Sequence, residues 1–214
     1  NGNGVYSTGY ANSIVSNKFY AVSSALVFNN SINNLIHSNY FNPYTTGGGI
    51  SLFSGSANNT ISKNNITTYT ASTMIVILDS ANNTLRENNI TDLNAGPTGV
   101  ITAFNSPNTT IESNIIDTQQ LAYEYIAGIN FNSSPGSTIN SNSIKVYSQF
   151  GRPSVIFFNN SANSTITNNN ITWGLICCSA SGAGLTLENS PQTYVFANNI
   201  NKTEQPGGGT DLPQ

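Results

Sequence analysis

The sequence contains very little charge. Only 7% of its 214 residues are Asp, Glu, Lys or Arg, against about a quarter in an average globular protein. The formal net charge is −3, so the chain lacks the positive surface that binds a phosphate backbone, and we expect no nucleic-acid partner. No apolar run approaches the length of about 18 residues that a membrane-spanning helix needs, so we expect no membrane span.

Residues that commonly carry chemistry are also scarce. The two cysteines, Cys177 and Cys178, are adjacent and cannot link distant segments; a vicinal disulfide and two buried thiols both stay open as alternatives. His37 is the only histidine, and the two cysteines have no His or acidic companions with metal-ligand spacing. We therefore expect no metal ion and no cofactor.

What the sequence does contain is a repeat built on asparagine, which occurs 36 times. The phrases SANNTISKNNIT, SANNTLRENNIT and SANSTITNNNIT occupy residues 56–67, 80–91 and 161–172. The Asn that lies three residues after the Ile or Leu of each phrase recurs in eight copies, at spacings of 22, 25, 24, 26, 28, 27 and 29 residues. We call it the anchor Asn, and its eight copies are Asn17, Asn39, Asn64, Asn88, Asn114, Asn142, Asn169 and Asn198.

The columns around the anchor predict the fold. Apolar residues recur three positions before it and two after it, and a Ser lies eight positions before it in every copy but the first, which has Gly9. The short runs are rich in Ile, Val, Phe and Thr and lack helical periodicity, which indicates strands. A strand-only repeat of this length fits one coil of a parallel β-solenoid. We expect an all-β domain of about eight coils over residues 1–202, followed by a Gly- and Pro-rich tail or linker over residues 203–214.

The asparagines themselves are explained by stacking. A buried Asn side chain has two donors and an acceptor, so it can bond its own turn and the Asn above and below it. Asn also tolerates the left-handed backbone conformation that a sharp corner needs. We therefore expect the anchor Asn to form an inward-facing ladder and the Ser column to form a second corner.

The phrase N-x-T-I-x-x-N-x-I resembles the right-handed parallel β-helix repeats of the pectin-lyase-like superfamily, with the NosD-like domains as the closest likeness. The resemblance extends over about residues 11–200 and implies a right-handed β-helix, a fold that carries lyases, hydrolases, adhesins and other functions. Enzymes of this kind use clustered ionisable groups, and no Asp-x-Asp or Arg-x-x-Arg cluster is present here. We therefore interpret the chain as a non-catalytic structural protein, such as an adhesin, a surface-layer component or a filament subunit.

Two alternatives stay open. A carbohydrate-active enzyme, either a lyase or a glycoside hydrolase, would be favoured by two carboxylates about 5–10 Å apart in a groove. Ice binding would need a flat, regular threonine array. One threonine column is present, although its neighbouring columns are mixed: Thr60, Thr84, Thr110, Thr138 and Thr165.

Eleven sequons of the form Asn-x-Ser/Thr are candidate glycosylation sites, although a chain rich in Asn and Thr also produces them by chance. Where the sequon directly follows the anchor Asn, strand alternation should point it outward. Glycans would place the protein outside the cell or on its surface. The eleven are Asn29, Asn58, Asn65, Asn82, Asn89, Asn108, Asn132, Asn159, Asn163, Asn170 and Asn201.

Segments of changing length separate the last strand of each copy from the next copy, and insertions in a solenoid gather on one face. Aromatic rings with a few polar groups suit a glycan or a neighbouring subunit. The alternative is that these rings fill a third strand. The candidate ligand-binding residues on this face are Tyr69, Tyr123, Tyr125, Tyr147, Arg152 and Trp173.

The two ends of the repeat predict self-association. A solenoid presents unpaired strand edges at both ends, which are normally protected by caps. Here NGNGVYSTGYANSIVSN enters the first coil with no capping helix, and NKTEQPGGGTDLPQ is too rich in Gly and Pro to pack as a cap. Either the chain was cut from a longer solenoid or its ends meet other subunits. We expect end-to-end assembly into a filament or array, with the tail lying along the next subunit.

Overall fold

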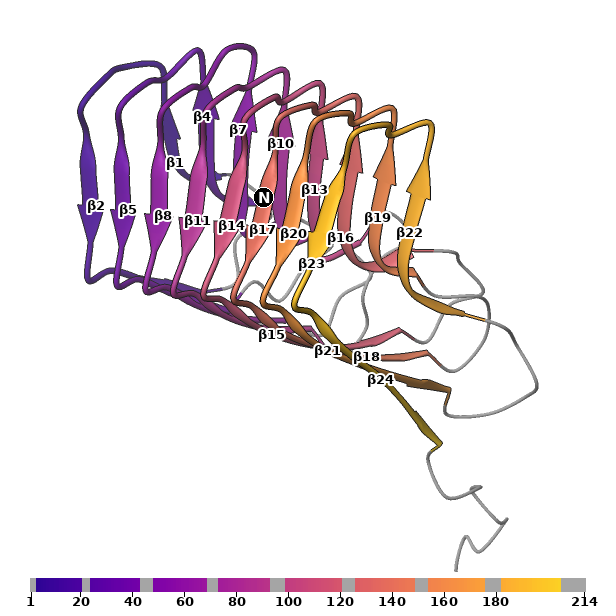
Figure 1. Ribbon diagram of the computed structural model, residues 1–214. Coiled ribbons are helices and arrows are strands. Elements are labelled where there is room, and N and C mark those ends of the chain that lie inside the picture. The colour runs from indigo at the N-terminus through magenta and orange to yellow at the C-terminus, as the bar shows by residue number, and fades with distance from the viewer. Residues whose placement is uncertain are drawn as a thin grey trace, which may run out of the picture.

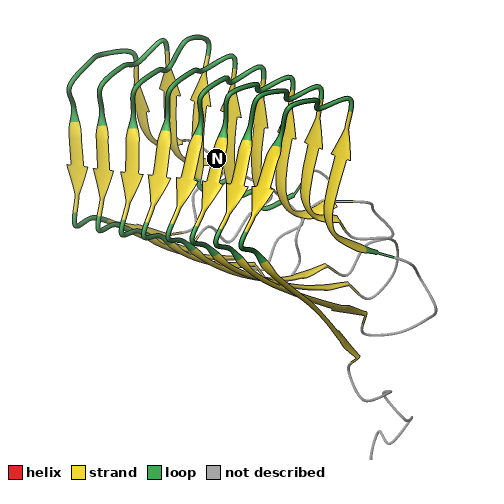
Figure 2. Cartoon of the chain, viewed as in Figure 1, coloured by secondary structure: helices red, strands yellow, loops and turns green. Residues whose placement is uncertain are grey.

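The computed structural model describes residues 3–20, 24–42, 48–68, 73–92, 99–120, 126–148, 154–175 and 182–204. These residues form three parallel sheets of eight strands each and no helix (Figures 1 and 2). Each coil contributes one strand to each sheet, which gives the eight layers that the eight repeat copies predict. The expected all-β parallel solenoid is therefore confirmed.

Sheet A contains the first strand of every coil: β1 (Asn3–Ser7), β4 (Ser24–Asn29), β7 (Ile50–Phe53), β10 (Ile75–Leu78), β13 (Ile101–Phe104), β16 (Ile126–Asn132), β19 (Ser154–Asn159) and β22 (Ala183–Glu188). Sheet B contains the second: β2 (Ser13–Val15), β5 (Leu35–His37), β8 (Thr60–Ser62), β11 (Thr84–Arg86), β14 (Thr110–Glu112), β17 (Thr138–Asn140), β20 (Thr165–Thr167) and β23 (Tyr194–Phe196). Sheet C contains the third: β3 (Lys18–Tyr20), β6 (Tyr40–Asn42), β9 (Asn65–Thr68), β12 (Asn89–Asp92), β15 (Ile115–Gln120), β18 (Ser143–Ser148), β21 (Asn170–Leu175) and β24 (Asn199–Glu204).

The coils stack in the register that the aligned columns predict. Leu85 of β11, for example, pairs with Ile61 of β8 and with Ile111 of β14. β24 continues to Glu204, two residues past the predicted end of the domain, and residues 205–214 lie outside the described part of the chain. Among the described residues there is no helix of the length and apolarity that a membrane crossing requires.

The core is a stack of apolar columns between the three sheets. Sheet B contributes one inward residue per coil, such as Ile61, Leu85 and Ile111, each with no exposed surface. Sheets A and C add larger side chains, and the rings of Phe131 and Phe158 stack with centroids 4.8 Å apart. Every inward residue lies over the equivalent residue of the preceding coil, so each added coil buries a similar set of apolar side chains. Each Å² of apolar surface buried in this way stabilises the fold by about 25 cal/mol.

The corner after sheet B departs from the expectation in one respect. The left-handed residue is the one before the anchor Asn and not the anchor itself: φ is 53° at Lys63, 54° at Glu87 and 56° at Asn168. This residue turns the backbone, which points its own side chain to solvent and aims the following Asn inward. A left-handed backbone conformation costs about 1–3 kcal/mol at a non-glycine residue. The hydrogen bonds of the anchor Asn that follows offset this cost.

Candidate interaction surfaces

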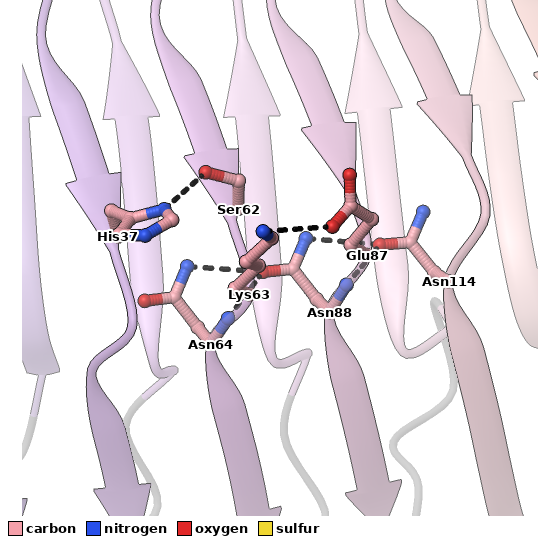
Figure 3. A network of polar contacts seen from close by, with 7 residues as sticks. All are labelled: His37, Ser62, Lys63, Asn64, Glu87, Asn88 and Asn114. Atoms are coloured by element: carbon pink, nitrogen blue, oxygen red, sulfur yellow. Dashed lines mark hydrogen bonds and ion pairs between the residues drawn. The ribbon is translucent and has the colours of Figure 1, made fainter.

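The anchor asparagines form a continuous buried ladder, as predicted. Asn64 donates its backbone N–H and its Nδ2 to Oδ1 of Asn88, each at 3.0 Å, and Asn88 does the same to Asn114 at 2.9 Å (Figure 3). Nδ2 of Asn88 also donates to the carbonyl of Ile61 in the preceding coil at 2.9 Å. The six inner anchors, Asn39 to Asn169, are each at most 2% exposed, so every lost contact would leave a polar group in a dry interior.

Two further ladders line the corner between sheets A and B. The Ser column was predicted, and the N–H of each Ser from Ser31 to Ser161 donates to Oγ of the next at 3.0–3.1 Å. The other ladder, five positions before the anchor, was missed. It runs from Asn12 through Asn34 and Asn59 to Asn83, with N–H to Oδ1 distances of 2.9 Å. The identical spacing of these asparagines in the repeat is the signal that could have found it.

All three ladders point in one direction. In each, the backbone N–H of one coil donates to a side-chain oxygen of the following coil. The anchor ladder therefore ends with the Oδ1 acceptor of Asn17 at the N-terminal coil and with the N–H donor of Asn198 at the C-terminal coil. Among the described residues, no donor reaches Oδ1 of Asn17, and the N–H of Asn198 reaches no acceptor.

The apolar columns are uncovered at the same two ends. Val195 and Ile200 of the last coil are 40% and 43% exposed, whereas Ile166 and Ile171 directly beneath them have no exposed surface. At the other end, Ile14 and Phe19 of the first coil are only partly buried. Each end of the described solenoid therefore presents a cross-section of its own core.

The predicted aromatic binding face is only partly visible. Tyr69, Tyr123, Tyr125 and Arg152 lie outside the described residues. Tyr147 lies on the outer side of sheet C, half-buried, with the Lys145 ammonium 5.0 Å from its ring centroid.

Trp173, another candidate of the aromatic binding face, lies in the core. Its side chain is 8% exposed because it points inward from β21, in register with the buried Val146. The alternative that the ring fills the third strand therefore holds for this residue. Lys202 of the last coil lies over it, with Nζ 5.4 Å from the ring centroid.

The comparison with known proteins agrees with this architecture. The family model described as "Right handed beta helix region" matches residues 3–152. The chain belongs to the right-handed β-helix family. No curated protein matches it. The trypsin-treated structure of QnrB1, described as a plasmid-mediated fluoroquinolone resistance protein, is similar over 85% of this chain and 92% of that one. The sequence identity is 11%, and the TM-score of 0.20 is too low to indicate a shared fold.

Among the described side chains, the charged ones other than Asp92 lie on the outside of this right-handed β-helix. Glu87 is paired with Lys63 at 3.4 Å and Asp117 with Lys145 at 3.7 Å, and all four side chains are roughly half exposed. Asp92 points inward and has no exposed surface, so it does not share a face with Asp117 of the adjacent strand. Within the described ranges, no group of three or more His, Cys, Asp or Glu side chains lies close enough to hold a metal ion.

The sequon asparagines lie on the outside of the β-helix. Eight are exposed, and Asn29, Asn132 and Asn159 are half-buried on sheet A. Asn65, Asn89 and Asn170, which directly follow the anchor, point outward as strand alternation requires. Several sequons are stacked on adjacent coils, and Asn108 Nδ2 donates to Asn82 Oδ1 at 3.1 Å.

The threonine column also lies on the outside of the β-helix, on sheet B. Thr60, Thr84, Thr110, Thr138 and Thr165 pair in register on five successive strands and are each half-buried. The outward column beside it is chemically mixed: His37, Ser62, Arg86, Glu112, Asn140 and Thr167. A single threonine row does not make the two-dimensional array that ice binding needs.

Proposed function

We propose that this right-handed β-helix is a non-catalytic structural protein that associates end to end at the cell surface or outside the cell. One observation carries the proposal: the two ends of the described solenoid are chemically opposite and complementary. The N-terminal coil offers the Oδ1 acceptor of Asn17, and the C-terminal coil offers the Asn198 N–H, each beside an uncovered apolar column. Open strand edges of this kind are templates for association.

The dispersed charge supports a structural role over catalysis. Glycoside hydrolysis needs two carboxylates that face the same bond, and lyases need carboxylates that hold a cation. Of the described acids, Glu87 and Asp117 pair with lysines on the surface, and Asp92 is enclosed in the core. The exposed amide and hydroxyl groups suit a surface that is solvated and neutral.

Assembly can be tested by sedimentation velocity and electron microscopy over a wide concentration range. The proposal expects the average mass to grow with concentration and the rods to lengthen along their axis. Removal of residues 205–214, which leaves β24 intact, tests the tail: a tail that lies along the next subunit makes assembly weaker when it is removed. A monodisperse monomer at every concentration, with or without the tail, would contradict the proposal.

The surface location has an independent test. Mass spectrometry of the native material measures glycan mass at the eleven sequons and the true chain termini together. Glycans on the exposed sequons support the extracellular assignment. A fully unmodified chain recovered from the cytoplasm of its source would refute it.

A further inference from the structure

We infer that the contact between chains is an in-register continuation of all three sheets, in which the C-terminal coil of one copy covers the N-terminal coil of the next. This inference rests on the proposed end-to-end assembly and specifies its geometry. In this geometry Asn198 lies over Asn17 of the next copy, and the anchor ladder runs without a break from one chain into the other.

The direction of the ladder hydrogen bonds determines which ends meet. Inside the chain, the N–H of Asn169 donates to Oδ1 of Asn198 at 2.9 Å, and that of Asn17 donates to Asn39 at the same distance. Placing Asn198 before Asn17 repeats this bond, because the open donor then meets the open acceptor. Two C-terminal ends would place donor against donor, and two N-terminal ends acceptor against acceptor, so neither symmetric pairing completes the ladder.

The apolar columns fit the same register. Continuing the internal pairing places Val195 over Ile14 in sheet B and Ile200 over Phe19 in sheet C. In sheet A it places Leu185 over Val5. All of these residues are at least partly exposed at the ends, while their equivalents in the inner coils are buried. In the contact, the apolar surface of each end coil is buried against a second copy. Each inner coil buries the same surface against the neighbouring coil of its own chain.

The outer side of sheet B adds a hydrophobic contact beside the core. Tyr194 and Phe196 of β23 are 59% and 60% exposed, and their rings stack with centroids 6.0 Å apart. In the continued sheet they lie next to Ser13 and Val15 of the next copy, and Val15 is itself 42% exposed. A head-to-tail contact of this kind does not close on itself, so it yields a filament.

Engineered disulfides test the register. In a chain with Cys177→Ser and Cys178→Ser, the pair Val15→Cys and Phe196→Cys places the two Cα atoms about 4.8 Å apart across the junction, within the disulfide range of about 4.4–6.8 Å. The matched control pair, Val15→Cys and Tyr194→Cys, is offset by two residues. Its Cα atoms are then about 8 Å apart, which is too far for a disulfide. We expect oxidation of the first pair to give a covalent series of dimers, trimers and longer species, at a yield at least tenfold above that of the second pair.

The outcomes separate this inference from the proposed assembly. A chain that stays monomeric refutes both. A chain that forms rods in which the offset pair cross-links as well as or better than the first pair, or in which neither pair cross-links, refutes the register alone.

A non-covalent test uses two exposed apolar residues. Val195→Asp at the end coil should weaken association at least tenfold, because it places a carboxylate in the junction core. Ile115→Asp, at a residue that is 56% exposed on the side of the rod, should leave association unchanged. Circular dichroism of both variants confirms that they are folded. Equal association of the two folded variants would overturn the assigned junction.

Discussion

Asn88 and Asn89 are adjacent residues of the same type, but only Asn88 belongs to the anchor ladder, so we expect them to differ in their contribution to stability. Asn88 is 1% exposed and its side chain accepts from the Asn64 N–H and donates to the Ile61 carbonyl and to Asn114. Asn89, the next residue, is exposed on the outer side of sheet C. The same change, Asn to Ala, should therefore have very different effects at the two positions.

The cost at Asn88 can be worked out from its contacts. Asn88→Ala leaves the buried Asn64 N–H with no acceptor, which costs about 1–3 kcal/mol. Loss of the bond to the Ile61 carbonyl adds about 0.5–1.5 kcal/mol. We expect a decrease of about 2–4 kcal/mol in the free energy of unfolding, whereas Asn89→Ala should change it by no more than about 0.5 kcal/mol.

Chemical denaturation followed by circular dichroism measures both variants. The comparison uses the midpoint and the denaturant dependence together, because a repeat protein can lose cooperativity between its coils. Hydrogen exchange of the Asn64 amide adds a local measurement, since that amide should lose protection in Asn88→Ala. Equal costs at the two positions would show that the side-chain ladder does not stabilise the coil and would refute the reasoning.

Three further predictions follow from the corners, the core and the sequons. Lys63 has a φ of 53°, a conformation that β-branched residues avoid, so Lys63→Ile should lower the free energy of unfolding by about 1–3 kcal/mol. Lys63→Gly should be neutral or stabilising despite the loss of an exposed ion pair, and thermal melts of both variants test this. Trp173→Ala should cost about 3–5 kcal/mol because the indole is core, whereas Tyr147→Ala should leave the fold intact and is the variant with which glycan binding is measured. Stacked sequons are separated by only one strand spacing of about 4.8 Å, so glycopeptide mapping should find no molecule with glycans on two neighbours of one column. That column contains Asn58, Asn82 and Asn108.

The sequence predicts the repeating part of the structure well because each column is sampled eight times. The position of the anchor, the outward direction of Asn65 and the Ser corner all follow from aligned copies and strand alternation. Corners are less predictable, because a left-handed residue interrupts the alternation of side chains. Asn58 and Asn59 are adjacent and identical, yet Asn58 has a φ of 57° and faces solvent while Asn59 forms a ladder inside.

Residues outside the repeat columns are less predictable. Asp92 and Trp173 occupy the same inward column of sheet C, in register with Thr118 and Val146. This column changes from polar to apolar along the rod, so composition gives no indication that it is buried. The direction of the ladders also could not be predicted, since an Asn side chain can donate toward either neighbour.

The coils differ in length, but the difference is confined to the part of each coil that follows the anchor Asn. From the Ser column to the anchor Asn the distance is eight residues in every coil that has the Ser, and the strands of sheet B always have three residues. The growth of the coil from 22 to 29 residues therefore falls in the strands of sheet C, which lengthen from three to six residues, and in the segment that leads to the next strand of sheet A. Evolution can lengthen, shorten or replace these connections one at a time without moving a ladder residue. The same separation makes these connections a row of insertion points at which foreign peptides could be displayed at the regular spacing of the strands.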